Sequence, residues 1–453
     1  MDKQLDNQLE KKYGLITAIS MVVGIVIGSG VFFKAEAVLK ATGGNVVIGI
    51  AAWIIVGLIM IICSYTFAIM ASRYEKVNGV VDYAEVIVGS RYAYYVGWFM
   101  TTIYIPALTS VLAWVSARYT CVLLGWDITG GSAMTIACFY LVGSYALNAL
   151  SPVLSGKFQV SSTIIKLIPL VLMAVIGLIV GLMNGMTVSN FTNLVDTSVT
   201  KGGGIFASVV AVAFAYEGWI IATSINAELK DSKKNLPKAL VIGSLIVVLV
   251  YIFYYIGLTG VVSTEVLIES GETGVMLAFK NIFGNLGGTL IFVFVILSCI
   301  GTLNGLMLGC TRGMYSLAIR GNGPIPETFK QIDRATNMPT NSAVFGVLIS
   351  AMWLLYFYGA NLTDPWFGRF CFDSSELPII TLYALYIPIF IMMMRKEKDL
   401  STFRRFIMPV LSIIGCLFMV VAAIFAHGKA VMYYLIIFAI IMGIGSFFNR
   451  NVK

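Results

Sequence analysis

Residues 21–33 read Met21-Val22-Val23-Gly24-Ile25-Val26-Ile27-Gly28-Ser29-Gly30-Val31-Phe32-Phe33, a glycine-rich interruption inside an apolar segment. The segment is too apolar for a soluble loop, and each glycine inside a helix costs about 0.5–1 kcal/mol relative to alanine. In a lipid bilayer, the backbone leaves helical geometry only where protein or a water-filled cavity satisfies its N–H and C=O groups. The pattern therefore predicts a broken helix whose ends face a small polar solute. Close helix packing through Gly24 and Gly28 is the alternative that this segment leaves open.

The composition of the whole chain indicates a membrane protein. Of its 453 residues, 59% are hydrophobic and 11% are charged, whereas soluble globular proteins carry about 25% charged residues. The mean hydropathy is +0.91. With about 20 apolar residues for each crossing, we expect an all-α polytopic membrane protein. Twelve transmembrane helices are predicted, over residues 15–40, 46–72, 83–118, 131–150, 157–184, 204–229, 237–262, 280–312, 341–359, 366–394, 405–426 and 429–448.

The placement of the basic residues explains the formal net charge of +8. If the N-terminus lies inside the cell, most of the 30 Lys and Arg residues fall in connections on the cytoplasmic side. This is the positive-inside bias of membrane proteins. It predicts a multi-pass protein of the cell membrane, embedded in the lipid bilayer, with both termini cytoplasmic. It does not indicate a nucleic-acid partner.

Cysteine and histidine usage argues against several kinds of chemistry. The seven cysteines form no Cys-x-x-Cys pair, so neither a zinc site nor a disulfide framework is indicated. His427 is the only histidine, which argues against a histidine-based metal site and against a membrane hydrolase built on a histidine base. We therefore expect a protein that is not an enzyme and that has no metal and no cofactor.

A second interruption of the same kind indicates an internal repeat. The stretch Phe214-Ala215-Tyr216-Glu217-Gly218-Trp219 lies halfway along the sixth apolar segment, five segments after the first break. Because five is odd, the second broken helix crosses in the opposite sense. We expect a single membrane transport domain, 1–453, with inverted repeats over 15–184 and 204–395 and two further helices over 405–448. Paired interrupted helices mark the substrate site of a transporter, near the middle of the membrane.

The two breaks together predict a site for an α-amino acid. Free N–H groups at residues 28–30, with the positive end of the half-helix that follows, favour a carboxylate. Free carbonyls at the ends of the preceding half-helices, near Val26 and Phe214, favour an ammonium group. The predicted substrate-binding residues are Val26, Gly28, Ser29, Gly30, Phe214, Ala215, Glu217 and Gly218.

Lys166 lies inside the fifth apolar segment, roughly 13 Å along a helix from Lys157. An ionisable group buried in a membrane costs several kcal/mol and indicates a function. We expect its ammonium group to tether the carbonyls of the first helix to Ser298 or Thr302 of the eighth. A lysine that reaches back to the membrane surface is the alternative.

Two further residues near the breaks have roles that the pattern leaves open. Glu217 lies in the second break, where it would bind a proton, pair with a cation or face a hydrated vestibule. Tyr251 is one of three tyrosines in the seventh segment. One of these tyrosines is a candidate gate, and the others are expected to serve packing.

Three motifs resemble those of a known family. They are GIVIGSGVF (24–32), FAYEGW followed by NAELKDSKKNLPKAL (214–240) and LSCIGTLNGLMLGCTRGMYSLAIRGNGPIP (297–326). They resemble the L-amino acid transporter family of the amino acid–polyamine–organocation superfamily, and within it the bacterial alanine–serine–cysteine exchangers. The resemblance implies an APC-type fold of five-plus-five inverted repeats with unwound first and sixth helices. It also implies sodium-independent exchange of amino acids by alternating access.

The resemblance also implies roles for individual residues. It places carboxylate binding at residues 29–30 and the ammonium-binding carbonyls at Val26 and Phe214, with the Phe214 ring as an outer gate. Lys166 matches a helix-five lysine that stands where related symporters hold a sodium ion. Tyr251 matches a helix-seven tyrosine near the cytoplasmic side of the site.

The chain departs from the family pattern in two places. Animal members carry an outer cysteine between helices three and four that bonds to a glycoprotein subunit, whereas residues 123–130 contain none and Cys121 lies earlier. We therefore expect no disulfide-linked heavy subunit. Relatives often have Gly, Ser or Asp at the position of Glu217, and the longer carboxylate leaves substrate size and proton coupling open.

These observations predict a sodium-independent exchanger, or antiporter, for small neutral L-amino acids such as Ala, Ser, Cys and Gly. The alternative is a proton-coupled amino acid symporter in which Lys166 or Glu217 titrates. A third interpretation is an amino-acid-sensing membrane receptor. It is disfavoured because the longest cytoplasmic connection, about 313–340, is too short for an output domain.

Overall fold

The computed structural model describes residues 14–28, 30–74, 79–192, 204–220, 229–336, 338–362 and 364–450. Over these ranges the chain is helical, and no β-strand is present in them. The elements of the first half are α1 (Leu15–Val26), α2 (Gly30–Thr42), α3 (Val46–Arg73), α4 (Val80–Ile87), α5 (Ser90–Phe99), the π-helical η1 (Met100–Tyr104), α6 (Ile105–Leu124), α7 (Gly131–Leu150), α8 (Pro152–Leu172), the π-helical η2 (Met173–Gly177), α9 (Leu178–Met183) and α10 (Met186–Thr192).

The second half begins with α11 and ends with α19. Its elements are α11 (Gly204–Ala215), α12 (Ser232–Val261), α13 (Thr264–Ser270), α14 (Glu272–Ala318), α15 (Pro326–Phe329), α16 (Thr340–Ala360), the 3-10 helix η5 (Gly368–Phe370), α17 (Leu377–Lys396), the π-helical η6 (Phe403–Ile407), α18 (Met408–His427) and α19 (Lys429–Phe447).

Ten helical runs within the described ranges are long and apolar enough to cross a membrane, where α5–η1–α6 counts as one run. The predicted first and sixth segments hold shorter apolar helices instead, over Leu15–Gly24 and Gly204–Ala215. The membrane-protein prediction is therefore supported by helix length and composition.

Three predicted boundaries need correction. The third span begins at Ser90, because Gly89, with φ +136°, separates α4 from α5. The eighth helix extends from Glu272 to Ala318 and contains a non-helical Gly284. The tenth begins at Leu377 rather than at residue 366, with Pro378 in its first turn, where proline costs no hydrogen bond.

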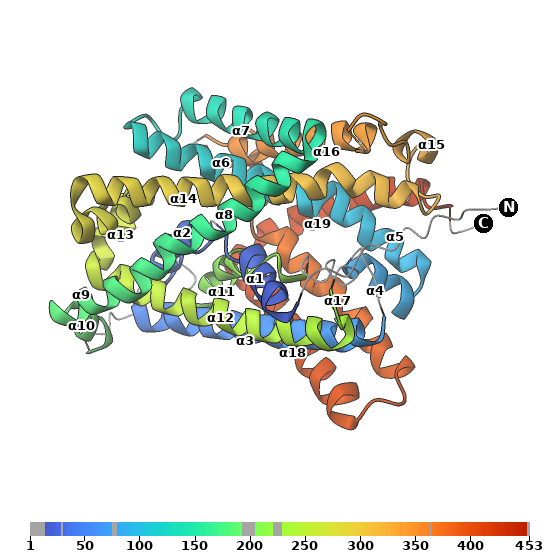
Figure 1. The fold of residues 1–453 in the computed structure, drawn as a ribbon, viewed down its shortest axis with the longest axis horizontal. Helices are drawn as coiled ribbons and strands as arrows, with labels where there is room; N and C mark the ends of the chain where they lie inside the picture. The colour runs from blue at the N-terminus through green and yellow to red at the C-terminus, as the bar shows by residue number, and fades with distance from the viewer. Residues whose placement is uncertain are drawn as a thin grey trace.

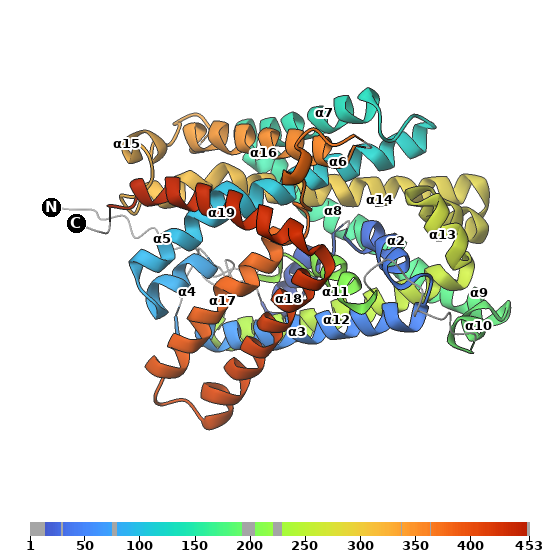
Figure 2. The same cartoon turned by 180° about the vertical axis from the view of Figure 1, so that it is seen from behind.

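The interrupted helices lie in the interior of the helix bundle. In both Figure 1 and Figure 2, α1, α2 and α11 lie between the long helix α14 on one side and the pair α3 and α12 on the other. Contacts agree with the pictures, since α1 packs on α12 and α11 packs on α2 and α3. The helices α13 and α15 lie at opposite ends of the molecule in both views. We use these two helices below to name the ends.

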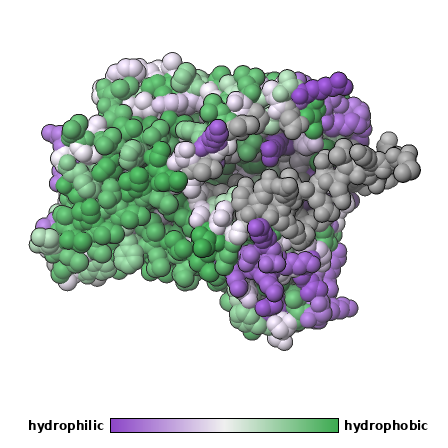
Figure 3. All heavy atoms as spheres, viewed as in Figure 1, coloured by the Kyte–Doolittle hydropathy of each residue, from purple (hydrophilic) through white to green (hydrophobic). Residues whose placement is uncertain are grey.

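The surface separates apolar from polar residues. Figure 3 shows hydrophobic residues covering the face over α8, α9 and α12, while hydrophilic residues gather near α15 and at the connection between α17 and α18. Ile164 and Ile179 on this face are exposed, as is Leu249. An apolar face of this extent is what a lipid-facing surface requires.

Candidate functional site

The first interruption separates α1 from α2. Helix α1 ends at Val26, Ile27 has extended backbone angles (φ −68°, ψ 105°), and α2 begins at Gly30. A Cβ atom at Gly30 would lie 2.5 Å from the Cα atom of Ala215, the last residue of α11. Only glycine therefore allows the two interrupted segments to touch at this point. Ser29 lies outside the described residues, so its role in carboxylate binding stays a prediction.

The second interruption follows α11 directly. Residues 216–218 form a turn in which Gly218 has φ +103°, a conformation that favours glycine. The Tyr216 hydroxyl donates to the carbonyl of Trp53 at 3.1 Å. The rings of Trp53, Tyr216 and Tyr251 pack against one another with centroids 5.2–5.6 Å apart. This aromatic cluster fixes the turn against α3 and α12.

A cavity of about 110 Å³ lies where the two interruptions meet. Its lining includes most of the predicted site residues, namely Val26, Gly28, Gly30, Lys166, Phe214, Ala215, Glu217, Gly218 and Thr302. The rest of the lining comes from residues that the sequence analysis did not identify, namely Tyr104, Leu108, Leu112, Gln159, Gly305 and Leu306. Tyr251 and Ser298 are not part of the lining. A volume of this size holds a small solute rather than a single water molecule.

Tyr251 joins the ends of the two interrupted helices. Its hydroxyl donates to the carbonyls of Val26 and Ala215, each at 3.1 Å. The carbonyl of Phe214 accepts from the Glu217 N–H at 3.4 Å. The carbonyls predicted to bind an ammonium group therefore already accept one hydrogen bond each. A carbonyl oxygen has two lone pairs, so each retains a second position for a ligand.

Lys166 links α8 to α1. Its side chain is 1% exposed, so it does not reach the membrane surface, and its ammonium group donates to the carbonyl of Gly24. The expected link to the eighth helix is not formed. The Thr302 hydroxyl donates to the Ser298 carbonyl at 3.0 Å on its own helix, and the Ser298 hydroxyl has no hydrogen-bond partner. Thr302 instead lies against Gly28, where a Cβ atom would be 2.8 Å from its hydroxyl oxygen.

Two acceptor atoms in the cavity wall have no hydrogen-bond partner. Glu217 is 8% exposed, and its Oε1 accepts from the Tyr104 hydroxyl, whereas its Oε2 has no partner. The Oε1 of Gln159 also has none. In the described ranges, no group of three or more His, Cys, Asp or Glu residues could hold a metal ion.

The cavity is closed toward α13 by rings and charges. Helix α2 runs from Gly30 toward α13, with which it packs. The Phe214 ring lies edge-on to the Phe33 ring at 6.0 Å, and the Lys34 ammonium lies 5.3 Å from the Phe214 ring. Phe214 lines the cavity, and Phe33 and Lys34 lie against the Phe214 ring.

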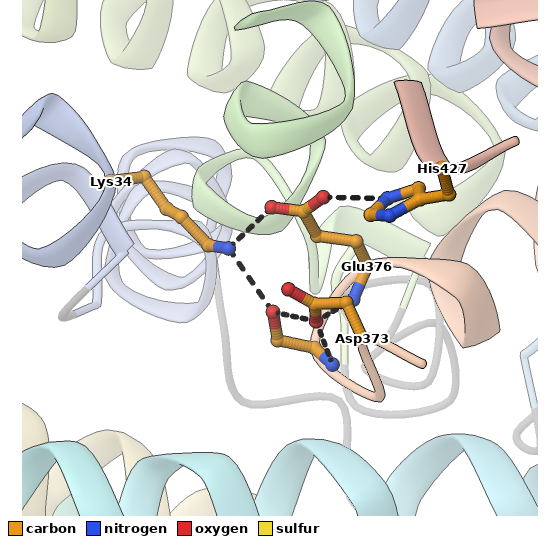
Figure 4. A network of polar contacts seen from close by, with 5 residues as sticks. Lys34, Asp373, Glu376 and His427 are labelled. Carbon is orange, nitrogen blue, oxygen red and sulfur yellow. Dashed lines mark hydrogen bonds and ion pairs between the residues drawn. The ribbon is translucent and has the colours of Figure 1, made fainter. Parts of the chain in front are cut away.

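The Lys34 network, which we define as Lys34, Asp373, Ser375, Glu376 and His427, continues this closure (Figure 4). The Lys34 ammonium lies 2.6 Å from Glu376 Oε1 and 3.0 Å from Ser375 Oγ, and Glu376 Oε2 lies 3.0 Å from His427 Nε2. Burial raises the pKa of the Glu376 carboxyl, but the nearby Lys34 charge and the His427 contact outweigh it and hold that pKa at about 2. The carboxylate is therefore ionised at physiological pH. The network joins α2 to the start of α17 and the end of α18.

A second cavity of about 260 Å³ adjoins the first on the opposite side. The two cavities share Gly305 and Leu306 of α14, and the second continues along α14 to Leu317. The arrangement is therefore asymmetric, with a closed wall toward α13 and a continuing cavity toward α15.

The chain is similar in sequence to several known proteins. A family model described as amino acid permease matches residues 13–447. The serine/threonine exchanger SteT of Bacillus subtilis is 30% identical over 421 residues, which cover 91% of each chain. The human cystine/glutamate transporter is 25% identical over 74% of this chain and 66% of its own length. The mouse b(0,+)-type amino acid transporter 1 is 25% identical over 85% of this chain and 81% of its own.

Proposed function

Because the chain belongs to the amino acid permease family, we propose that it is an antiporter that exchanges small neutral L-amino acids across the cell membrane. Amino acid transport itself follows from the family and from relatives that are named as exchangers and transporters. The observation that carries the finer proposal is the cavity of about 110 Å³ at the meeting point of the ends of α1, α2 and α11.

Backbone groups recognise the parts that all amino acids share. The N–H groups at the start of α2 and the positive end of that helix bind the carboxylate. The second lone pairs on the carbonyls of Val26, Phe214 and Ala215 accept from the ammonium group. A ligand whose carboxylate is esterified would lose the first of these interactions. The small volume favours alanine, serine, glycine and cysteine as substrates.

Lys166 makes exchange independent of sodium. Its buried amino group lies between α8 and the end of α1, where it donates to the Gly24 carbonyl. A symporter of similar architecture would need a bound metal ion to hold that helix end. Because the lysine never leaves, substrate movement needs no sodium gradient.

The remaining parts of the proposal concern architecture and topology. We propose twelve membrane-crossing helices in two inverted repeats, 15–184 and 204–395, followed by two helices over 405–448. Both termini and the α15 end are cytoplasmic, which makes the α13 end extracellular. The exchanger works without a disulfide-linked heavy subunit, a proposal supported by the position of Cys121, which is buried inside α6.

Alternating access is supported by the asymmetry of the two ends. The wall of Phe33, Phe214 and the Lys34 network closes the extracellular side while the second cavity continues toward the cytoplasm. An amino acid supplies the charges that the helix ends require, so a loaded site closes readily. An empty site leaves those ends unpaired when water is excluded, which raises the barrier to the return of the empty carrier.

Counterflow in proteoliposomes tests the proposal. Uptake of radiolabelled alanine should be at least tenfold faster into vesicles preloaded with unlabelled alanine or serine than into empty vesicles, with or without sodium. Vesicles that contain the Gly30→Ala variant serve as a control, because the added Cβ would separate α2 from α11. Equal uptake into empty and preloaded vesicles would reject exchange.

Glu217 favours a second candidate, proton-coupled symport. A buried carboxylate with one unpartnered oxygen is a group that could take up a proton with each substrate. In that case uptake into empty vesicles should require an acid-outside gradient, and Glu217→Gln should abolish the effect of that gradient. Exchange predicts that the gradient changes uptake by neither the normal protein nor the Glu217→Gln variant.

A further inference from the structure

Tyr104 reaches the cavity from an irregular part of its helix. The π-helical η1, Met100–Tyr104, interrupts the α-helical run between Ser90 and Leu124 and ends at this tyrosine. Short π-helical insertions change the direction in which side chains project, and they occur often at functional sites. The Tyr104 side chain is fully buried, and its hydroxyl donates to Glu217 Oε1. This hydrogen bond fixes the carboxylate in one orientation.

The same hydrogen bond leaves the other carboxylate oxygen unpaired. Glu217 is more than nine-tenths buried, it lines the cavity, and its Oε2 has no partner. An unpaired buried acceptor costs about 1–3 kcal/mol, and more if it carries charge. A ligand that brings a donor to this oxygen recovers that cost, and a ligand without a donor does not.

Gln159 provides a second acceptor from a different helix. Its amide lies against Gly305 of α14, where a Cβ atom would be 3.3 Å from its Nε2 and 3.4 Å from its Oε1. Because residue 305 is glycine, the amide has room beside the cavity that both residues line. Its Oε1 is buried without a partner. Two acceptors on separate elements therefore face the same small volume.

We propose that Tyr104, Glu217 and Gln159 form a side-chain subsite that selects amino acids with a hydroxyl group on a short side chain. This inference rests on the proposed exchange function and deepens it. The hydroxyl donates to Glu217 Oε2 or to Gln159 Oε1, and Tyr104 is a positioning residue that keeps Glu217 oriented. Serine and threonine are the substrates that satisfy this chemistry.

The other walls of the cavity explain why the ligand is neutral and short. Lys166 lines the same cavity as Glu217, so a substrate side chain with a positive charge would lie near another basic group. Leu108, Leu112 and Leu306 form apolar walls, which accommodate the methyl group of threonine. A site that hydrogen-bonds a substrate hydroxyl discriminates strongly against the analogue that lacks it.

Pairs of substrates that differ only by the hydroxyl test the subsite. Apparent KM values for serine against alanine, and for threonine against 2-aminobutyrate, are measured by counterflow in proteoliposomes. The normal protein should favour the hydroxyl member of each pair at least tenfold. Glu217→Ala should remove this preference, Gln159→Leu should reduce it, and Glu217→Gln should restore part of it because the amide oxygen still accepts.

Tyr104→Phe should reduce the preference severalfold, because Glu217 loses the donor that orients it. Tyr255→Phe is the matched control, because Tyr255 is as buried as Tyr104, but its hydroxyl has no hydrogen-bond partner and it does not line the cavity. It should leave the preference unchanged. Serine counterflow in each protein separates the two proposals, since its absence from the normal protein would reject exchange itself. If exchange is intact, any of three results would overturn the hydroxyl subsite. The first is equal KM values within each pair, and the second is an equal loss for both members in every variant. The third is stronger competition by 2,3-diaminopropionate than by serine.

Discussion

Removing the Lys34 charge should open the wall toward α13. The Lys34–Glu376 pair joins α2 to the start of α17 at 2.6 Å, with both side chains less than 10% exposed. In the proposed alternating access, α2 and the start of α17 separate when the α13 side opens, so the pair would form only in the closed state. Truncating one member of a buried ion pair costs about 3–5 kcal/mol, because the remaining charge is left without its partner.

We expect a free-energy cost at the lower end of this range, because Glu376 keeps its contact with His427 at 3.0 Å. A cost of about 3 kcal/mol corresponds to a change of about a hundredfold in the balance between the closed and open states. Lys34→Met should therefore shift the protein toward the state that is open at the α13 end. The double variant Lys34→Met/Glu376→Met should return it toward the closed state, because two apolar side chains often replace a buried ion pair without loss.

Thiol accessibility measures this balance. A single reporter, Leu112→Cys, lines the cavity, and Cys138 and Cys371 are replaced by serine because they are not fully buried. A membrane-impermeant maleimide added at the α13 side should label the reporter tens of times faster in Lys34→Met than in the parent or in the double variant. Equal labelling rates in all three proteins would refute the argument that this pair holds the wall closed.

Three further variants test the cavity. Lys166→Met should reduce exchange at least tenfold at equal protein levels, because the Gly24 carbonyl loses its donor, whereas Lys157→Met on the exposed part of the same helix should not. Near-normal rates in Lys166→Met would show that Lys166 has no such role. Tyr251→Phe removes the donor shared by two helix ends and should raise the apparent KM on the α15 side about fivefold, as the loss of one hydrogen bond of about 1 kcal/mol predicts. An equal change in KM on both sides would contradict the placement of Tyr251 on the α15 side of the site. Gly30→Ala should abolish binding of labelled alanine, while Gly443→Ala, where an added Cβ meets nothing within 4 Å, should not; unchanged binding in Gly30→Ala would show that the two segments separate freely.

The sequence predicted the centre of the site better than its walls. Glycines and a carboxylate inside apolar segments are conspicuous, because lipid tolerates them only for a reason, and residues 28, 30, 217 and 218 come together around one cavity. The family resemblance, which rested on the same segments, is confirmed by the match over residues 13–447. The binding roles of these residues stay predictions.

The missed residues share a physical reason. Tyr104 and Gln159 are single polar residues in helices that contain other polar residues, so no local pattern distinguishes them. Their position depends on the π-helical turn of η1 and on the space beside Gly305, neither of which has a sequence signal. Lys34 and Glu376 are 342 residues apart, and only the fold of the whole chain brings them together. Lys166 donates to a carbonyl of the first helix, as predicted, but its predicted link to Ser298 or Thr302 is not formed.

The contact between Gly30 and Ala215 has a consequence for protein engineering. The two positions belong to different interrupted segments, yet neither tolerates a larger residue unless the other retreats, so their sizes should vary together among related chains. A library intended to enlarge the range of substrates should therefore keep both residues and randomise Leu108, Leu112 and Leu306. Those three leucines border the cavity but stand apart from the contact between the broken helices, so they can change shape without uncoupling the moving parts.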